Sequence, residues 1–252
     1  LSPRPRAREV ILSSAPGASA ALALLHRMKG ATGAVAAFEI MNRLSVDLVV
    51  KNVPNTRDPI PGAALMVLIE LEAMHAHGLR EAAEEALAAA IEAGEVQTAL
   101  IAENASQARD FWRVREEISA GHRPEGAQVN HDVSVPVSQT PAFLARANDA
   151  MEEICPGARI VAFGHMGDGN FHYTVMQPEG SDPARFPGGR LTRAVNEIAA
   201  GLNGSISAEH GIGVARTDDL ARFKDPHSLA LMRIVKQAID PNRIMNPRAL
   251  IP

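Results

Sequence analysis

Strand-like and helix-like segments alternate along nearly the whole chain, and this alternation is the strongest constraint on its fold. Strands show apolar residues with a period of two, whereas amphipathic helices show a period near 3.6. The glycine fingerprint of a dinucleotide-binding βαβ unit is absent, and hairpin signals are present. We therefore expect an α+β fold with a largely antiparallel sheet and helices mainly on one face. A doubly wound parallel sheet is the alternative.

The predicted elements follow from periodicity and from residues that start or stop helices. The strands are predicted at residues 9–14, 34–40, 63–73, 96–104, 132–137 and on both sides of a turn within 161–175. The helices are predicted at residues 18–30, 78–94, 106–121, 140–155, 188–204 and 226–247. Gly30 is expected to end the first helix, and Ser106 and Thr140 are expected N-caps, with Pro141 at the first helical position. The sequence shows no internal repeat.

Composition excludes several classes of protein. The net charge of -4, with no basic run between aromatic residues, argues against nucleic-acid binding. Cys155 is the only cysteine, which rules out an internal disulfide and a multi-cysteine metal site and fits a reducing cytoplasm. No apolar run reaches the roughly 20 residues that a membrane span needs, and no secretion signal is visible. We expect a cytoplasmic protein.

The N-terminus has the character of a linker between domains. The chain begins at Leu1, and LSPRPRAREV is rich in proline and arginine. We therefore expect residues 1–10 to be the remnant of an interdomain linker and residues 11–252 to form one domain.

The stretch GHMGDGNFH, residues 164–172, places two histidines around a glycine-rich turn. If Asp168 and Gly169 are the central residues of a type I′ hairpin, His165 lies directly opposite His172. Directly opposed Cβ atoms are about 4.5–5.5 Å apart on one face of a sheet, which suits two nitrogen ligands of one metal ion. Alternatively, both histidines are half-exposed polar residues beside a turn. The register favours the metal interpretation.

A third ligand is available in SAEHGIG, residues 207–213. Glu209 and His210 are neighbours there, and Gly211 and Gly213 let the backbone pass close to a ligand. One residue of the pair can bind a metal while the other takes part in chemistry. Two histidines and one carboxylate leave a coordination position open, as catalytic divalent-metal sites do.

These two motifs, followed by LMRIVKQAIDPNRIMNP at residues 231–247, resemble the C-terminal domain of FAD-linked oxidases. The relevant group contains the D-lactate dehydrogenases, glycolate oxidases and D-2-hydroxyglutarate dehydrogenases. The resemblance extends to FWRVREEI, DVSVPV and, more loosely, AAFEIMN. It implies a ferredoxin-like substrate domain, with FAD held mainly by a separate preceding domain that this sequence lacks.

The resemblance implies a metal centre with a neighbouring base. His165, His172 and Glu209 fall on positions that bind a divalent metal, zinc being the expected ion. His210 falls on the position of the general base. Oxidation of a 2-hydroxy acid requires loss of the hydroxyl proton while a hydride leaves the α-carbon, and a histidine suits the proton transfer. A metal beside the hydroxyl lowers its pKa and orients the substrate.

The resemblance also implies substrate and flavin contacts. An arginine at the end of the FWRVR segment aligns with one that binds the substrate carboxylate through paired hydrogen bonds. The alternative is an exposed arginine paired with one of the two glutamates that follow it. The implied substrate-binding residues are Arg115, Ser119 and Asn170, and the implied flavin contacts are Asn170 and Asn246.

One departure from the family concerns specificity. Relatives that bind dicarboxylates tend to have a lysine just before the DVSVP-like strand, where this sequence has Asn130. His131 does not replace that lysine, because neighbouring residues on a strand point to opposite faces. A cationic contact with a second carboxylate is therefore missing at this position.

The sequence thus predicts the C-terminal domain of an FAD-dependent dehydrogenase. It would oxidise a D-2-hydroxy acid such as lactate, glycolate or 2-hydroxyglutarate to the 2-oxo acid, and the isolated domain would be inactive. The expected partners are the small hydroxy acid, the protein's own FAD-binding domain, an unidentified electron acceptor and a second copy in a homodimer. An alkyl-dihydroxyacetone-phosphate synthase-like domain and a non-catalytic metal-binding or assembly module are the alternatives.

Overall fold

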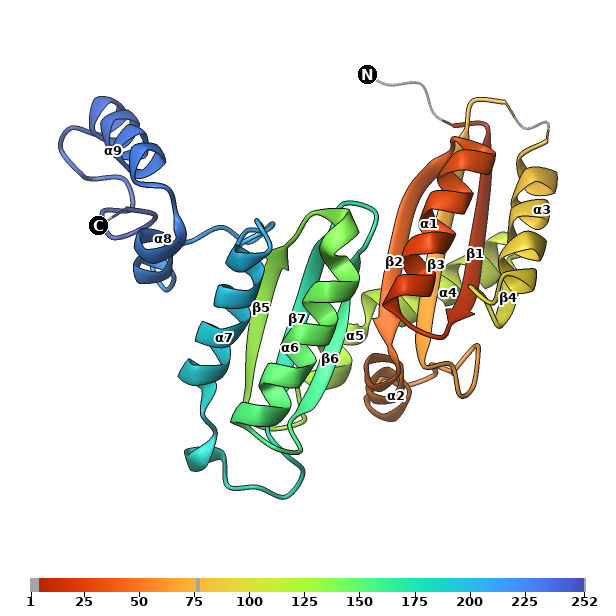
Figure 1. The fold of residues 1–252 in the computed structure, drawn as a ribbon, viewed down its shortest axis with the longest axis horizontal. Coiled ribbons are helices and arrows are strands. Elements are labelled where there is room, and N and C mark those ends of the chain that lie inside the picture. Colours follow the sequence, from red (N-terminus) through yellow and green to blue (C-terminus); the bar gives the residue numbers. More distant parts are fainter. Residues whose placement is uncertain (1–4, 76–77, 252) are drawn as a thin grey trace.

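Seven strands form one antiparallel sheet within residues 5–75 and 78–251, the part of the chain that the computed structural model describes. Their order across the sheet is β4-β1-β3-β2-β6-β7-β5 (Figure 1). The strands are β1 (Ala7–Ala15), β2 (Val35–Asn42), β3 (Leu65–Ala73), β4 (Thr98–Ile101), β5 (Gln128–Ser134), β6 (Arg159–His165) and β7 (Asn170–Met176). The predicted α+β class with an antiparallel sheet is confirmed.

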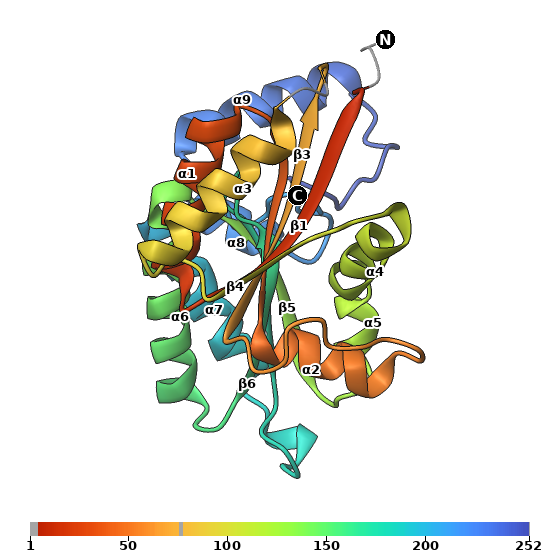
Figure 2. The same cartoon turned by 90° about the vertical axis from the view of Figure 1, so that its right-hand side faces the viewer.

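Helices cover both faces of the sheet, with the long ones on one side (Figure 2). That side carries α1 (Ala18–Thr32), α3 (Leu79–Glu92), α6 (Thr140–Ile154) and α7 (Gly188–Gly201). The other side carries the shorter α2 (Arg43–Asn52), α4 (Ala105–Glu116) and α5 (Ile118–His122). Two 3-10 turns, Val137–Gln139 and Pro183–Arg185, precede α6 and α7. β3 is buried from Leu65 to Leu71 because helices cover both of its faces, so it reads as a continuous apolar run rather than an alternating one.

The sheet consists of two ferredoxin-like halves. Apart from α2, which is inserted between β2 and β3, the first half follows the order strand, helix, strand, strand, helix, strand from β1 to β4, and its strands lie in the order β4-β1-β3-β2. The second half repeats this pattern from β5 to α7 with the order β6-β7-β5. A single bridge between Ser134 and Ser205 lies where the fourth strand of the repeat belongs. The structure therefore repeats where the sequence does not.

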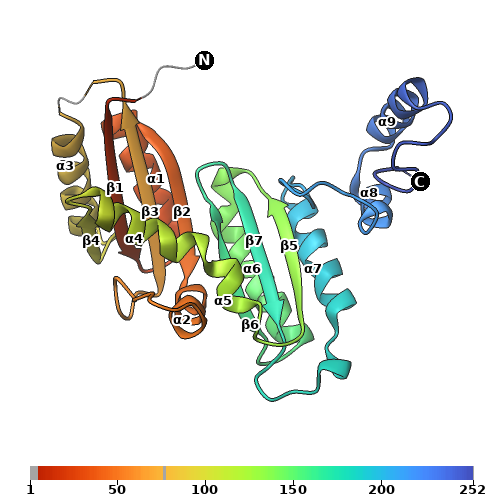
Figure 3. The ribbon, with the colours of Figure 1, turned by 180° about the vertical axis from the view of Figure 1, so that it is seen from behind.

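The two halves join where β2 pairs with β6. This pairing joins Glu39 to His165, Ile40 to Gly164 and Met41 to Phe163. From behind, α4 and α5 run across this junction (Figure 3). Below the long helices the core is built around aromatic residues such as Phe38, Phe143 and Tyr173. Below α2, α4 and α5 a separate core contains Met41, Phe111 and Phe163.

Several predicted element ends are wrong. Gly30 lies inside α1, which ends at Thr32 because Gly33 adopts the left-handed conformation with φ 60°. Asn104, not Ser106, caps α4, and its side-chain oxygen accepts hydrogen bonds from the backbone of Ser106 and Gln107. Thr140 is the first residue of α6 rather than a hydrogen-bonding cap.

Other corrections concern the extent of elements. Strand β1 begins at Ala7, inside the segment 1–10 predicted as a linker; residues 1–4 lie outside the described part. The helix predicted at 106–121 is divided at Glu117 into α4 and α5. β5 begins at Gln128, four residues before the predicted strand. Helix α2 was not predicted.

A small C-terminal unit lies beyond α7 (Figures 1 and 3). It contains α8 (Thr217–Phe223), which was not predicted, and α9 (Pro226–Ile239), which ends well before residue 247. Its core consists of Leu220, Leu229 and Ile251. Among the described residues, no helix combines the length and the apolar character that crossing a bilayer requires.

His131, on β5, is a buried histidine that the fold keeps neutral. Its Nδ1 lies 2.8 Å from the Tyr173 carbonyl oxygen, and its Nε2 lies 3.1 Å from the Thr192 hydroxyl. A carbonyl can only accept, so Nδ1 carries the proton and Nε2 accepts from the hydroxyl. Burial lowers the pKa of His131 from 6.5 to about 4. As expected from the alternation along a strand, it points away from the face that Asn130 occupies.

This neutral histidine makes stability depend on pH. The unfolded chain binds a proton at His131 near pH 6.5, whereas the folded chain does so only near pH 4. Its contribution is therefore complete above pH 6.5 and is lost as the pH falls through 4, at most about 3 kcal/mol. Urea unfolding at pH 7 and pH 4.5 should show a smaller difference in unfolding free energy for His131→Gln than for the wild type. His26→Gln, at an exposed position of α1, should keep the wild-type difference; identical behaviour of both variants would contradict the assignment.

Candidate active site

A cavity of about 230 Å³ lies in the second half of the sheet, on the face that carries α5. α5 contributes Ser119, β6 contributes Phe163, and the segment after α7 contributes His210. The strands β5 and β7 contribute Asn130, His172 and Thr174. His172 and His210, which belong to the two histidine-containing motifs of the sequence, thus both line one cavity.

The β6–β7 hairpin differs from the predicted one. Phe163, not His165, pairs with His172, and the turn contains the four residues Met166–Gly169. The backbone nitrogens of Asp168 and Gly169 both donate to the His165 carbonyl, at 3.2 and 3.0 Å. Gly169 has a positive φ but Asp168 does not, so the predicted type I′ turn is wrong. The reason is that the turn contains four residues rather than two, so His172 pairs with the residue two positions earlier on β6 than predicted.

His165 and His172 nevertheless share a face, because a register shift of two residues leaves every side chain on its original side. Their ring centroids are 6.4 Å apart, and they are diagonal rather than direct neighbours. Gly164 allows β6 to pass this close to β7: it has φ 154°, and a Cβ there would lie 2.3 Å from the Asn170 carbonyl oxygen.

Glu39 on β2 orients His165. This carboxylate is 1% exposed, and its Oε1 lies 2.6 Å from His165 Nδ1. Because a carboxylate accepts, His165 Nδ1 must donate, which leaves Nε2 as the free ligand atom. Oε2 of Glu39 accepts a second hydrogen bond, 2.8 Å long, from Nε of Arg115.

Asp132 on β5 holds the segment that contains Glu209 and His210. Its Oδ2 accepts hydrogen bonds from the backbone nitrogens of Ala208, Glu209 and His210, at 3.2, 2.9 and 2.8 Å. Asp132 is 1% exposed, so these bonds form in an environment where an unpaired carboxylate would be costly. The His210 ring stacks on His172 with centroids 5.5 Å apart.

The side chains of His165, His172 and Glu209 form a group that fits a metal ion. Their ligand atoms lie within 4.8 Å of one another, and His165 Nε2 is 3.4 Å from Glu209 Oε1. Tetrahedral zinc with bonds near 2.0–2.1 Å places its ligand atoms about 3.4 Å apart, and two imidazoles with a carboxylate are a donor set that zinc accepts. A second group, Asp132, His172 and His210, meets the same distance criterion, but three backbone N–H groups already occupy Asp132 Oδ2.

The surroundings of His172 keep its ring neutral, which is the form that a metal ligand requires. Burial, followed by the charge of Arg115, lowers the pKa of His172, so its ring is neutral at neutral pH. The hydrogen bond to Glu39 raises the pKa of His165. Burial acts to raise the pKa of Asp132, but the backbone N–H groups of His210 and Glu209 outweigh it and the pKa is lowered. A metal held by this group would therefore compete with a proton more at His165 than at His172.

Arg115 lies beside the metal-ligand group rather than on the protein surface. It is 9% exposed, stacks over the Phe163 ring at 4.7 Å and pairs with Glu39, not with the glutamates that follow it. Its two terminal nitrogens make no hydrogen bond within the described residues. Asn170 at the start of β7 is also buried, and its side-chain oxygen lacks a partner in that same part of the chain. Both side chains retain hydrogen-bonding capacity for a ligand.

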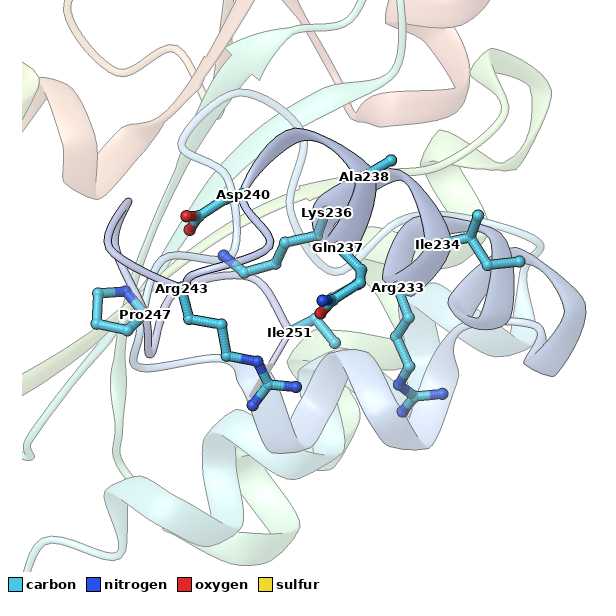
Figure 4. A pocket seen from close by; sticks show the side chains of 9 residues that line it. All are labelled: Arg233, Ile234, Lys236, Gln237, Ala238, Asp240, Arg243, Pro247 and Ile251. Atoms are coloured by element: carbon cyan, nitrogen blue, oxygen red, sulfur yellow. The ribbon is translucent and has the colours of Figure 1, made fainter.

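Asn246, predicted at the flavin, is not brought to this group. It lies in the C-terminal unit, where its carbonyl accepts from Lys236 at 3.4 Å. That unit has a groove of about 540 Å³, in which the Arg233 and Arg243 guanidinium groups point away from Asp240 (Figure 4). Asp240 uses its carboxylate to hold the backbone of Ile244 and Met245. The residues that line the groove include no histidine, and both oxygens of its one carboxylate, Asp240, already accept backbone hydrogen bonds.

Sequence reasoning missed three residues of the site. Glu39 and Asp132 are carboxylates within otherwise apolar strands, and that anomaly was the available signal. Thr174 carried no such signal; its hydroxyl donates to the Asn130 side chain at 2.8 Å.

Residues 4–250 match the family described as FAD linked oxidases, C-terminal domain, and the chain belongs to this family. Its curated relatives include mitochondrial D-2-hydroxyglutarate dehydrogenase of Arabidopsis thaliana, 33% identical over 86% of the chain and 38% of the relative. D-2-hydroxyglutarate dehydrogenase of Stutzerimonas stutzeri is 37% identical over 71% of the chain and 39% of the relative. The rat mitochondrial enzyme is 29% identical over 99% of the chain and 46% of the relative. The chain thus spans less than half the length of these relatives.

Solved structures show the same fold at low sequence identity. p-Cresol methylhydroxylase with bound substrate has a TM-score of 0.67 at 13% identity, over 100% of this chain and 54% of its own. Alkyldihydroxyacetonephosphate synthase has a TM-score of 0.56 at 13% identity, over 97% of this chain and 46% of its own. These likenesses carry the architecture and no more.

The anchoring of the Glu209–His210 segment by Asp132 is testable. Asp132→Asn removes the charge from several backbone hydrogen bonds, and bonds to charged groups contribute about 1.5–3 kcal/mol each. We expect the free energy of unfolding in urea to fall by about 2 kcal/mol and proteolysis to become faster within residues 205–216. Asp168→Asn, in the exposed hairpin turn, is the matched control and should change neither. Unchanged proteolysis of Asp132→Asn would contradict the anchoring role.

Proposed function

We propose that this chain is the substrate-side domain of an FAD-dependent dehydrogenase that oxidises a D-2-hydroxy acid to the 2-oxo acid. The observation that carries the proposal is the convergence of the ligand group His165, His172 and Glu209 with His210 and Arg115. A metal site alone would not require a neighbouring histidine and a buried arginine with free terminal nitrogens. The names of the relatives and the FAD-linked family support the same activity.

Each residue has a distinct task in this reaction. Arg115 binds the substrate carboxylate through its terminal nitrogens and so orients the α-carbon. His210 accepts the proton of the α-hydroxyl at an imidazole nitrogen as the hydride leaves the α-carbon. His165, His172 and Glu209 hold the divalent metal, expected to be zinc. When bound, the metal would lower the pKa of the hydroxyl, and FAD would serve as the hydride acceptor.

The other residues that line the cavity beside His172 and His210 suit an anionic, polar substrate. Arg123 and Arg216 contribute positive charge, and Ser119 contributes a hydroxyl. Asn130 and Thr174 bond to each other where a lysine would bind a second carboxylate. We propose that Asn170 completes the substrate contacts and also reaches the flavin. Lactate, glycolate and 2-hydroxyglutarate all meet the chemical requirements of this site.

The activity is tested by flavin reduction in the full-length, flavin-loaded protein. Under anaerobic conditions, one or more of D-lactate, glycolate and D-2-hydroxyglutarate should bleach the flavin, whereas L-lactate and L-2-hydroxyglutarate should not. Removal of the metal by a chelator should slow bleaching by about a hundredfold, because a metal contributes several kcal/mol of charge stabilisation. Added Zn²⁺ should restore the rate. If no hydroxy acid reduces the flavin, the proposed function is wrong.

The division of roles between the histidines gives a second test. His210→Ala should slow flavin reduction by about 10²–10⁴-fold, the usual contribution of a general base, and leave the zinc content unchanged. His165→Ala and His172→Ala should instead lower the zinc content, measured by atomic emission after dialysis. His26→Ala on exposed α1 is the control for loss of any histidine. Equal zinc loss in the His210, His165 and His172 variants would contradict this division.

A further inference from the structure

Glu39 is shared between two side chains that the proposed mechanism uses for different purposes. Its Oε1 accepts from His165 Nδ1 at 2.6 Å, and its Oε2 accepts from Arg115 Nε at 2.8 Å. Each carboxylate oxygen thus holds one partner. The three residues come from β2, β6 and α4, so no local sequence geometry brings them together.

The hydrogen bond between Glu39 and His165 fixes the orientation of the imidazole ring. With Nδ1 donating to Glu39, the imidazole presents Nε2 toward Glu209, 3.4 Å away. Carboxylates that accept from the second nitrogen of a metal-binding histidine fix its tautomer and its ring orientation, and their loss lowers metal affinity. Glu39 meets this description, and it is not one of the ligands.

The hydrogen bond between Glu39 and Arg115 fixes the orientation of the guanidinium group. Glu39 engages Nε, and the guanidinium plane is also held by the Phe163 ring at 4.7 Å. The terminal nitrogens, which provide the paired hydrogen bonds of a carboxylate clamp, are left for the substrate. A carboxylate at Nε therefore aims the arginine without competing for its binding edge.

We infer that Glu39 is a positioning residue that couples the metal ligand His165 to the substrate-binding Arg115. The inference rests on the proposed function of that site. A displacement of the carboxylate would change both the direction of His165 Nε2 and the aim of the Arg115 fork. Metal affinity and carboxylate binding should consequently fall together when Glu39 is altered.

Glu70 provides a matched control. It lies on the adjacent strand β3, on the same face of the sheet, and is 9% exposed. It is likewise shared between a cation and a ring nitrogen, since Arg8 and Trp112 Nε1 both donate to its Oε2, at 2.5 and 2.7 Å. Neither partner belongs to the metal-ligand group. Glu70→Gln therefore reproduces the loss of a buried carboxylate without touching the site.

The test compares Glu39→Gln with Glu70→Gln in the full-length, flavin-loaded protein. The dissociation constant for Zn²⁺, measured by competition with a chromophoric chelator, should rise about 10–100-fold in Glu39→Gln and stay within about threefold in Glu70→Gln. Binding of pyruvate or 2-oxoglutarate, followed by perturbation of the flavin spectrum, should weaken in the same variant. Both measurements are independent of turnover, so they remain informative even if no hydroxy acid reduces the flavin.

Three outcomes would overturn the inference. They are unchanged Zn²⁺ affinity in Glu39→Gln, an equal loss in Glu70→Gln, or a loss of Zn²⁺ affinity with unchanged binding of the oxo acid. Thermal unfolding of both variants shows whether each is folded. If Glu39→Gln does not fold, Glu39→Asp retains the charge but is one methylene shorter, and it should show the same paired losses at smaller size. Wild-type values for both ligands in Glu39→Asp would then contradict the positioning role.

Discussion

The pairing of β2 with β6 is the contact on which the candidate site depends. It joins two ferredoxin-like halves through Glu39 with His165, Ile40 with Gly164 and Met41 with Phe163. The same pairing places Glu39 directly opposite His165, so that the carboxylate and the imidazole meet where the two halves join. Gly164 lets β6 pass close to β7 beside this pairing, because any side chain there would collide with the Asn170 carbonyl. The β2–β6 pairing therefore both joins the halves and positions residues of the candidate site.

Two buried carboxylates hold the site from opposite sides. Glu39 reaches His165 and Arg115 from β2, whereas Asp132 holds the backbone around Glu209 and His210 from β5. Buried charges are tolerated when hydrogen bonds offset their desolvation. Both oxygens of Glu39 and Oδ2 of Asp132 accept such bonds from groups that belong to the site, whereas Asp132 Oδ1 has no partner among the described residues. These hydrogen bonds explain why two carboxylates occupy otherwise apolar strands: Glu39 orients side chains of the site, and Asp132 orients a backbone segment of it.

Sequence patterns predicted much of the fold and part of the site. Alternating periodicity identified the antiparallel α+β class and most strands, because it reflects which faces are buried. It missed α2 and α8. It also placed helix ends incorrectly, because nearby residues of the same capping types were chosen, and only the local backbone geometry shows that Asn104 and Gly33 are the caps. The hairpin prediction brought His165 and His172 to one face although its register was wrong, because a shift of two residues conserves the face. Glu39 was missed because its role depends on contacts between sequence-distant strands.

The separation of the site residues along the chain has a consequence for folding. Glu39 and His165 are 126 residues apart, and Asp132 and His210 are 78 apart. Contacts between distant residues form only after loop closure has been offset by docking of the intervening elements. Each ferredoxin-like half can gain its own strand pairing first, but neither contains a complete ligand group with its supporting carboxylates. The geometry of the candidate site therefore needs both halves, because the second half and the segment after it supply His165, His172 and Glu209, and the first half supplies Glu39.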